Sequence, residues 1–565
     1  MEKRFKITLA IIAAVFAGTI SSDACTNVLV TKGASKDGSV MVTYAADSHQ
    51  LYGELYFKKA SDWAAGSLLD VYCWDEGNYL GQIPQIPHTY QTVGNMNEYQ
   101  LTITETTFGG VRGLANKNGI IDYGSLIYIT LQRAKTAREA IAVMDELTQT
   151  YGYASGGESF SIADKNEVWI MEMVGKGEEK GSVWVAVRIP DGYVSAHANQ
   201  SRIHKFDQKD PDNCLYSKDV ITFAKKKGLY KGSDKDFSFC DTYCPADFSG
   251  LRSCEARVWA AFNIMGKGKF VWEDASGSHS ESADSYLDFA MGNNTTHKMP
   301  LYIKPAEKLG VHEVADIMRD HYEGTPMDMT QDVGAGPNHL PYRWRPMSWK
   351  VDGAEYVHER AIATQQTGFW ILCQSRSWLP DEVGGILWFG VDDAATSPLT
   401  PVYTNIISVP EYFEVGNGSM IEYSPTSAFW QTNKVTHFAY LMYDRVAPVI
   451  REKIYQYEDE CFKAVTATDA KVLSMLRNSN IDGAKTAMTN MVNDLATQYF
   501  NNWKVLENDL LVKFMDGNVK VQNPDGTYKI HTEGTAIPAS PAHPAFPERW
   551  LRGIVNDHGE TVKVK

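Results

Sequence analysis

The chain has 565 residues, and its 54 Lys and Arg against 69 Asp and Glu give a formal net charge of −15. This balance excludes a basic nucleic-acid-binding protein as the default class. With 44% hydrophobic, 22% charged and 12% aromatic residues, the composition excludes wholesale disorder and predicts a folded protein with a large core.

The first 24 residues have the pattern of a secretory signal peptide. Three basic residues precede an apolar run, 7–20, and the small residues Ser22 and Ala24 lie three and one before Cys25. The run is shorter than the roughly 20 residues of a membrane-spanning helix, so we expect no stable membrane span. We expect signal peptidase to cleave after Ala24 and the protein to be periplasmic or secreted. Lipidation of Cys25 is the alternative, although lipoprotein signals usually carry Leu where Ser22 stands.

The first predicted elements are strands that begin at this cleavage site. Two β-rich segments flank Asp37-Gly38, a strong hairpin signal. Thr136 opens a helix as the N-cap of a capping box, and that helix ends before Gly152. The later segments lie at meander spacing and predict a multistranded antiparallel layer. The strands are predicted at 26–31, 39–45, 98–108, 159–163, 168–174, 183–189 and 193–198.

The second half of the chain passes from strands to helices. Strands are predicted at 361–366, 369–374 and 385–391. Apolar residues then recur at helical spacing in 432–465 and 484–511. The stretch 518–543 is rich in Gly, Pro and Thr and predicts a loop or an extended tail.

Eight cysteines are too few for a disulfide scaffold. Four lie close together in the sequence and indicate disulfides, whose pairing the sequence does not define, or buried thiols. Zinc is the alternative, but the Cys240-x3-Cys244 pair has no second closely spaced Cys or His pair. The clustered cysteines are Cys214, Cys240, Cys244 and Cys254, and the isolated Cys73, Cys373 and Cys461 are predicted to be buried.

Cys25 is the residue whose chemistry the sequence singles out. The motifs H-E-x-x-H, G-x-x-x-x-G-K-[ST] and G-x-S-x-G are absent from the sequence, so zinc proteases, P-loop enzymes and serine hydrolases of those types lose support. Cleavage after Ala24 would give Cys25 a free α-amine with a pKa near 8, which can accept the thiol proton. The precursor would be inactive, because there the nitrogen belongs to a peptide bond.

An ordered set of blocks carries a resemblance to a known family. The blocks are Cys25-Thr26-Asn27, Asp37-Gly38, Asp47-Ser48, Glu158–Asp164, Glu167–Glu172, Val194–Ile203, Cys254–Trp259 and Thr364–Gly368. They resemble the cysteine dipeptidases of the N-terminal-nucleophile hydrolases, of the dipeptidase A type, which are relatives of penicillin V acylase and bile-salt hydrolase. The resemblance implies an α+β fold, the four-layer αββα sandwich of antiparallel sheets. It also implies hydrolysis of dipeptides or short peptides through a thioester, with no metal or organic cofactor.

The resemblance assigns roles to four residues. Cys25 matches the nucleophile, and Asp47 matches the acid that holds the cysteine amine. Asn199 matches the side-chain amide of the oxyanion hole, and Arg257 matches a cation near the sulfur that favours the thiolate. The last three each have a plainer alternative: a solvated Asp at a strand end, an Asn that forms a turn, and an Arg in an ordinary ion pair with Glu255 or another acid.

One position departs from the family pattern. Related sequences often have Arg three residues before the acid, where this chain has Tyr44, which can donate a hydrogen bond but carries no permanent charge. The handling of a substrate carboxylate could differ accordingly. Asn116 lines the site or forms an ordinary Asn-Lys-Asn-Gly turn. His49, His197 and His204 lie near the motifs and are structural or contact the substrate.

The chain therefore divides into a signal peptide (1–24), a peptidase domain (25–431) and a mostly helical C-terminal extension with a tail (432–565), which could pack on the domain or join two copies of the chain. Two other functions stay open. The enzyme could act instead on N-acyl amides of the penicillin V or bile-salt kind. Alternatively, the chain could be a lipid-anchored surface protein that binds a ligand through exposed Trp side chains.

Overall fold

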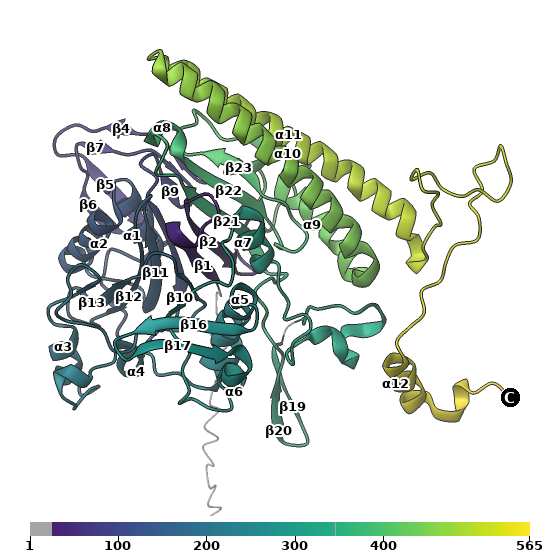
Figure 1. Ribbon diagram of the computed structural model, residues 1–565, viewed down its shortest axis with the longest axis horizontal. Coiled ribbons are helices and arrows are strands. Elements are labelled where there is room, and N and C mark those ends of the chain that lie inside the picture. The colour runs from purple at the N-terminus through teal and green to yellow at the C-terminus, as the bar shows by residue number, and fades with distance from the viewer. Residues whose placement is uncertain (1–24, 345) are drawn as a thin grey trace, which may run out of the picture.

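The computed structural model describes residues 25–344 and 346–565, so the predicted signal peptide lies outside the described residues. Two antiparallel sheets stack face to face, and helices cover the outer side of each sheet (Figure 1). This arrangement confirms the predicted α+β sandwich. None of the described helices combines the length and the apolar character that crossing a bilayer requires.

In the first sheet, the first strand of the described chain, β1, is an interior strand. This sheet has seven strands, and β1 lies between β14 and β2. Asn27 of β1 lies opposite His197, and Leu29 lies opposite Val42. The strands in order are β18 (Tyr302–Ile303), β14 (Val194–His197), β1 (Asn27–Val30), β2 (Val40–Asp47), β21 (Thr367–Ser375), β22 (Gly385–Val391) and β23 (Thr400–Tyr403). The strand that follows Cys25 is therefore held on both sides.

The second sheet contains the predicted meander, with one correction. Its central strands, β10 to β13, pair antiparallel in chain order. Residues 193–198 were expected in this layer, but they form β14, which crosses to the first sheet and pairs with β1. The alternation of a strand fixes its faces and not the sheet that it joins. The eight strands in order are β15 (Cys214–Tyr216), β13 (Ser182–Arg188), β12 (Val168–Gly175), β11 (Gly157–Ala163), β10 (Thr102–Thr107), β9 (Met96–Asn97), β8 (Thr92–Val93) and β3 (Phe57–Lys58).

Helices α1 (Tyr123–Leu131) and α2 (Ala137–Tyr151) cover the outer side of the second sheet. The Thr136 hydroxyl accepts the Glu139 backbone N–H, and α2 ends before Gly152, as predicted. The Glu139 carboxylate accepts from the backbone N–H of Lys135, one residue before the N-cap. The capping box is therefore present in a shifted form.

The C-terminal helices cover the first sheet. They are α9 (Ala428–Leu441), α10 (Tyr443–Arg477) and α11 (Ile481–Phe514), and the last two form the long hairpin at the top of Figure 1. The predicted helix over 432–465 is interrupted at Met442, whose φ of −144° is not helical. Buried side chains of all three helices join one core with the sheet. The boundary at residue 432 stays a prediction.

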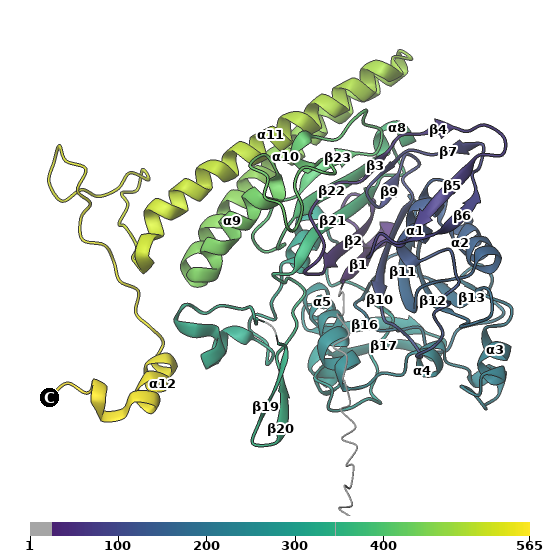
Figure 2. The same ribbon diagram turned by 180° about the vertical axis from the view of Figure 1, so that it is seen from behind.

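The remaining described segments are short. Residues 361–366 were expected to form a strand but form a loop before β21, in which the backbone N–H of Thr367 donates to Thr364. Figure 2 shows the tail running away from the hairpin to α12 (Glu548–His558). The other helices are α3 (Val220–Lys226), α4 (Phe239–Tyr243), α5 (Ala256–Gly266), α6 (Leu287–Ala290), α7 (Val311–Met318) and α8 (Asp381–Gly384). The other strands form ribbons: β4 (Ser61–Asp62) with β7 (His88–Thr89), β5 (Leu68–Tyr72) with β6 (Tyr79–Pro84), β16 (Lys269–Asp274) with β17 (Gly277–Ser282), and β19 (Ser348–Val351) with β20 (Ala354–Val357).

Candidate active site

Cys25 lies two residues before the start of β1 and is buried, with 3% of its surface exposed. Its Sγ lies 3.5 Å from a carboxyl oxygen of Glu105 and 3.7 Å from the Tyr44 hydroxyl. Tyr44 in turn donates a 2.9 Å hydrogen bond to Glu105. Burial raises the pKa of the Cys25 thiol well above its usual range, and the negative charges of Glu105 and Asp47 add to this effect. The thiol therefore holds its proton at neutral pH until positive charge or a base is supplied.

Asp47 ends β2 and is fully buried. Its carboxylate accepts a 2.7 Å hydrogen bond from the Thr367 hydroxyl and forms an ion pair with Arg360, at 3.1 Å. Burial raises the pKa of Asp47 to about 6, against the opposing effects of Arg360 and Thr367. The carboxyl is therefore largely ionised at neutral pH, as a group that holds an ammonium must be.

Arg257 joins the two halves of the predicted site. It belongs to α5 and is fully buried. One guanidinium nitrogen donates to the backbone carbonyl of Cys25, at 2.6 Å, and to the Thr26 hydroxyl, at 2.8 Å. The other donates to the side-chain oxygen of Asn199, at 2.9 Å. Arg257 thus reaches Cys25 through the main chain, and its expected effect on the thiol stays a prediction.

Asn199 follows β14 in the left-handed region, with φ of 58°, which Asn adopts more readily than most residues. Because its side-chain oxygen faces Arg257, its amide nitrogen points the other way and donates to the Thr107 carbonyl, at 2.8 Å. The loop after it is held by Glu172 of β12, which accepts the backbone N–H of Arg202. Asn199 therefore forms a turn after the strand, as its plainer alternative predicted, and it also contacts Arg257. Its role in the oxyanion hole stays a prediction.

Other sequence candidates lie in structural positions. Asn116 occupies a turn, where its side-chain oxygen accepts the Asn118 backbone N–H, at 2.9 Å. Its part in substrate binding stays a prediction. His197 is fully buried between the hydroxyls of Thr106 and Ser161, at 2.7 Å each. Burial lowers the pKa of His197 to about 3, so the ring is neutral and serves the packing between the sheets.

The cysteines other than Cys25 are free thiols, so no disulfide forms among the described residues. Cys240 lies with His204 and Asp241, and the potential ligand atoms of the three are within 4.8 Å of one another. Lys298 also contacts the carboxylate of Asp241, at 2.5 Å. The ammonium supplies the positive charge that a cation would bring to this cluster.

Three buried residues of the site were missed by the sequence interpretation: Glu105, Glu158 and Arg360. A signal existed for Glu105, because it shares the face of a predicted alternating strand with Leu101 and Ile103, both fully buried. An acidic side chain on the core side of a strand requires an explanation. Arg360 comes from the segment before the misassigned strand, where no pattern pointed to it.

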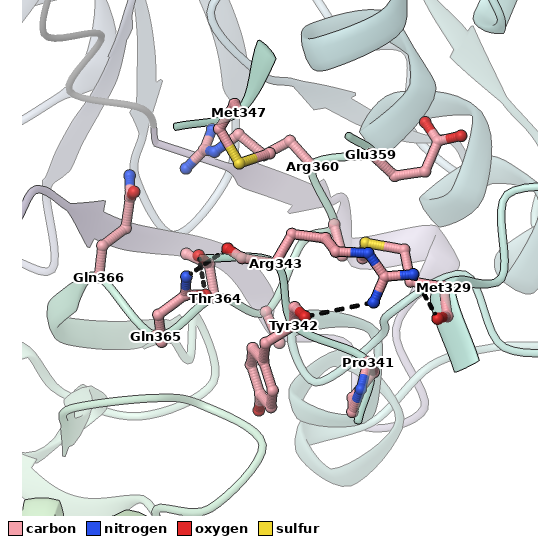
Figure 3. Close-up of a pocket in the computed structure, with 12 residues that line it drawn as sticks. Met329, Pro341, Tyr342, Arg343, Met347, Glu359, Arg360, Thr364, Gln365 and Gln366 are labelled. Carbon is pink, nitrogen blue, oxygen red and sulfur yellow. Dashed lines mark hydrogen bonds between the residues drawn. The ribbon is translucent and has the colours of Figure 1, made fainter. Parts of the chain in front are cut away.

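A pocket adjoins this cluster. Figure 3 shows its lining, which includes Arg360 and Gln366. Arg360 pairs with the Asp47 carboxylate, and the Gln366 amide donates to the Asp47 carbonyl, at 3.2 Å. Arg343 also lines the pocket and donates to the Met329 carbonyl, at 2.7 Å. The pocket therefore offers a polar opening with two guanidinium groups, of which that of Arg360 lies beside Asp47.

Comparison with known proteins places this geometry in a family. Residues 65–456 match Peptidase family C69. The matched region contains Asn116, Asn199 and Arg257 and begins after Cys25 and Asp47.

Curated relatives extend the likeness at low identity. A "Probable dipeptidase" of Latilactobacillus sakei is 25% identical over 413 residues, which cover 70% of this chain and 77% of the relative. A "Probable dipeptidase" of Salmonella dublin is 24% identical over 408 residues, covering 67% and 81%. A "Probable dipeptidase A" of Streptococcus pyogenes serotype M3 (strain SSI-1) is 24% identical over 430 residues, covering 73% and 82%.

Proposed function

Because this chain belongs to peptidase family C69 and is thus a hydrolase that acts on peptides, we propose that it is a dipeptidase whose nucleophile is the thiol of Cys25 at the mature N-terminus. The names of the curated relatives support the dipeptidase class. The observation that carries the assignment of the nucleophile is the position of Cys25, a buried thiol at the start of an interior strand, in contact with Tyr44 and Glu105.

Removal of the leader is the activating step in this proposal. Before cleavage, burial and then the acids around Cys25 raise the pKa of its thiol. Cleavage after Ala24 creates an α-ammonium beside these acids, and the Asp47 carboxylate can hold it. The new positive charge offsets the acids and lowers the pKa of the thiol. In its neutral form the same amine accepts the thiol proton.

The reaction then proceeds by acyl transfer. The Cys25 thiolate attacks the carbonyl carbon of the scissile bond, and the oxyanion accepts hydrogen bonds from the Asn199 amide and a backbone N–H. The α-ammonium protonates the leaving nitrogen as the C–N bond breaks, which leaves a thioester. The amine then takes a proton from water, whose oxygen attacks the thioester, and the acid product leaves as the thiol is restored.

We also propose that the chain is exported and that signal peptidase removes residues 1–24. The test is intact mass and N-terminal sequencing of the protein from its native compartment, combined with iodoacetamide labelling and a dipeptide assay. We expect Cys25 at the N-terminus, and alkylation of Cys25 should abolish hydrolysis. Cys25→Ala should be inactive, whereas Cys73→Ala, at a half-buried thiol, should retain activity. A lipid-modified Cys25, or full activity after its alkylation, would contradict the proposal.

A further inference from the structure

One wall of the pocket beside Asp47 is a segment that belongs to neither sheet. We call residues 329–343 the wall segment; they contribute to the pocket lining Met329, Pro341, Tyr342 and Arg343. The segment turns through two short 3-10 helices, and Gly336 and His339 in it have φ values of 62° and 52°. Because no strand ladder holds its backbone, other groups must fix its course.

Arg343 holds the start of the wall segment from the side of the pocket. Its side chain is buried, and one guanidinium nitrogen donates to the Met329 carbonyl and to the Asp332 carboxylate, at 2.7 Å each. The Asp332 carboxylate also accepts the backbone N–H of Gly334, at 2.7 Å. The position of Arg343 in the pocket therefore depends on where residues 329–332 lie.

The C-terminal tail, residues 518–565, holds the same residues from the other side. Figures 1 and 2 show that the tail leaves the end of the long helical hairpin and brings α12 to the wall segment. Arg549 of α12 donates to the Thr330 carbonyl, at 2.7 Å, and to the Asp332 carbonyl, at 3.0 Å. The same guanidinium lies 3.2 Å from Nδ1 of His339. The start of the wall segment thus has a guanidinium group on each side.

Arg549 is the polar contact that fixes α12 in place. No residue of α12 is buried, and its apolar side chains Leu551 and Val555 are exposed. Arg549 and Gly553, one turn apart and therefore on one face, are half-buried, and Gly553 lies against Val333. Within the described chain, every hydrogen bond between the tail and the wall segment comes from Arg549, and no acid pairs with it. Its charge is therefore directed at the carbonyl groups of the wall segment.

The sequence of the tail defines a helix that carries Arg549 at its start. Pro547 precedes the helix, and Glu548 in the first turn complements the positive end of the helix dipole. Gly559, with φ of 57°, ends it. The region that matches the family, residues 65–456, includes the wall segment and not the tail. The contact between them is therefore a feature that the family match does not describe.

We propose that the tail completes a pocket that binds part of the peptide substrate, with Arg549 as a positioning residue that holds the wall segment and, through it, Arg343. This inference rests on the proposed function, in which the pocket lies beside the acid that holds the cysteine amine. Without the Arg549 contacts, Arg343 would keep its hydrogen bonds to a wall that is held from one side only. Substrate binding should weaken, whereas the chemical step at Cys25 should not change.

The test compares Arg549→Ala with Arg552→Ala in the mature protein. Both variants remove one positive charge from α12, but Arg552 is exposed and pairs with Glu548 of the same helix, so it is the matched control. For Arg549→Ala, we expect KM for alanyl-alanine to rise about 10-fold, as for a lost hydrogen bond to a charged group, and kcat to stay within about twofold. Hydrogen exchange at the backbone N–H groups of residues 329–343 should become about 10-fold faster, with no change in β1. Arg552→Ala should match the wild type in both measurements.

A double-variant comparison separates positioning of Arg343 from a general loosening of the fold. If Arg549 acts through Arg343, adding Arg549→Ala to Arg343→Ala should change KM by less than about twofold. A further rise of about 10-fold would overturn the route through Arg343. If Arg343→Ala does not fold, the comparison of Arg549→Ala with Arg552→Ala still decides.

The outcomes separate this proposal from the proposed function. Unchanged hydrogen exchange of residues 329–343 in Arg549→Ala would overturn the contact with the tail. Faster exchange with an unchanged KM, or a fall in kcat alone, would overturn the positioning role and leave the dipeptidase assignment intact. A wild type that hydrolyses no peptide would overturn the proposed function and the effect on KM with it, while hydrogen exchange still tests the contact.

Discussion

Glu105→Gln should stabilise the full 565-residue chain at alkaline pH, although it removes a side chain of the candidate site. In the folded chain the pKa of Glu105 is about 7, compared with an ordinary value of 4.5, because of its burial. The unfolded state therefore releases this proton first, and the free energy of unfolding decreases as pH rises from about 4.5 to 7. The shift corresponds to about 3 kcal/mol at pH 8, at about 1.4 kcal/mol for each pH unit. Gln keeps the size and can accept the Tyr44 hydroxyl without this cost.

Urea unfolding at fixed ionic strength, from pH 4.5 to 8, measures the effect. The advantage of Glu105→Gln over the wild type should be small at pH 4.5, increase up to pH 7 and then level off. The control variant Glu533→Gln, at an exposed Glu, should follow the wild type throughout. A difference between variant and wild type that does not change with pH, or a variant that is less stable at pH 8, would refute the reasoning. In the cleaved protein the new ammonium lowers the pKa of Glu105, so the pH dependence should be weaker.

Three further changes test other parts of the structure. Thr367→Val removes a hydrogen bond to the Asp47 carboxylate, so the pKa of Asp47 should rise from about 6 by about one pH unit. The acid limb of the pH profile of kcat/KM should move to higher pH by the same amount. An acid limb that does not move would show that another group titrates there. Arg257→Lys loses the forked contacts to the Cys25 carbonyl and the Asn199 side chain. In the proposed mechanism it should lower kcat about 100-fold with little change in KM. A change confined to KM in steady-state assays would contradict this. Trp503→Ala, at a buried position of α11, should lower the free energy of unfolding in urea titrations by about 3–5 kcal/mol. Val505 is 59% exposed, so Val505→Ala should lower it by under about 0.5 kcal/mol. Equal losses in the two variants would show that α11 lies outside the cooperative core.

Local patterns in the sequence predict most elements of the fold. The helix between Thr136 and Gly152 was predicted with both ends, since an N-cap hydroxyl and a glycine stop with positive φ are local chemistry. The strand at 385–391 was predicted with both bounds, since a continuous apolar run marks a strand buried on both faces. By contrast, the sheet that 193–198 joins depends on partners more than 150 residues away, which alternation within a strand does not encode.

The site was predictable to the extent that it lies in short motifs. The resemblance located Cys25, Asp47, Asn199 and Arg257, and the structure brings these residues together through direct contacts or shared partners. Glu105 and Glu158 were not predicted as site residues, because a carboxyl on a core-facing position has meaning only when its neighbour across the sheet is known. Arg360 was missed for a similar reason: it reaches Asp47 from a loop whose course depends on tertiary packing.

The interior position of β1 has a consequence for the timing of biosynthesis. Its partner β14 begins 164 residues after Val30, at Val194. At roughly 5–20 residues per second, the ribosome needs about 8–33 seconds to make that interval. Throughout this time, β1 lacks the partner for one of its two edges and cannot take its final place in the sheet. Cys25 can therefore take its final place in the sheet only after the strand that leads to Asn199 has been made.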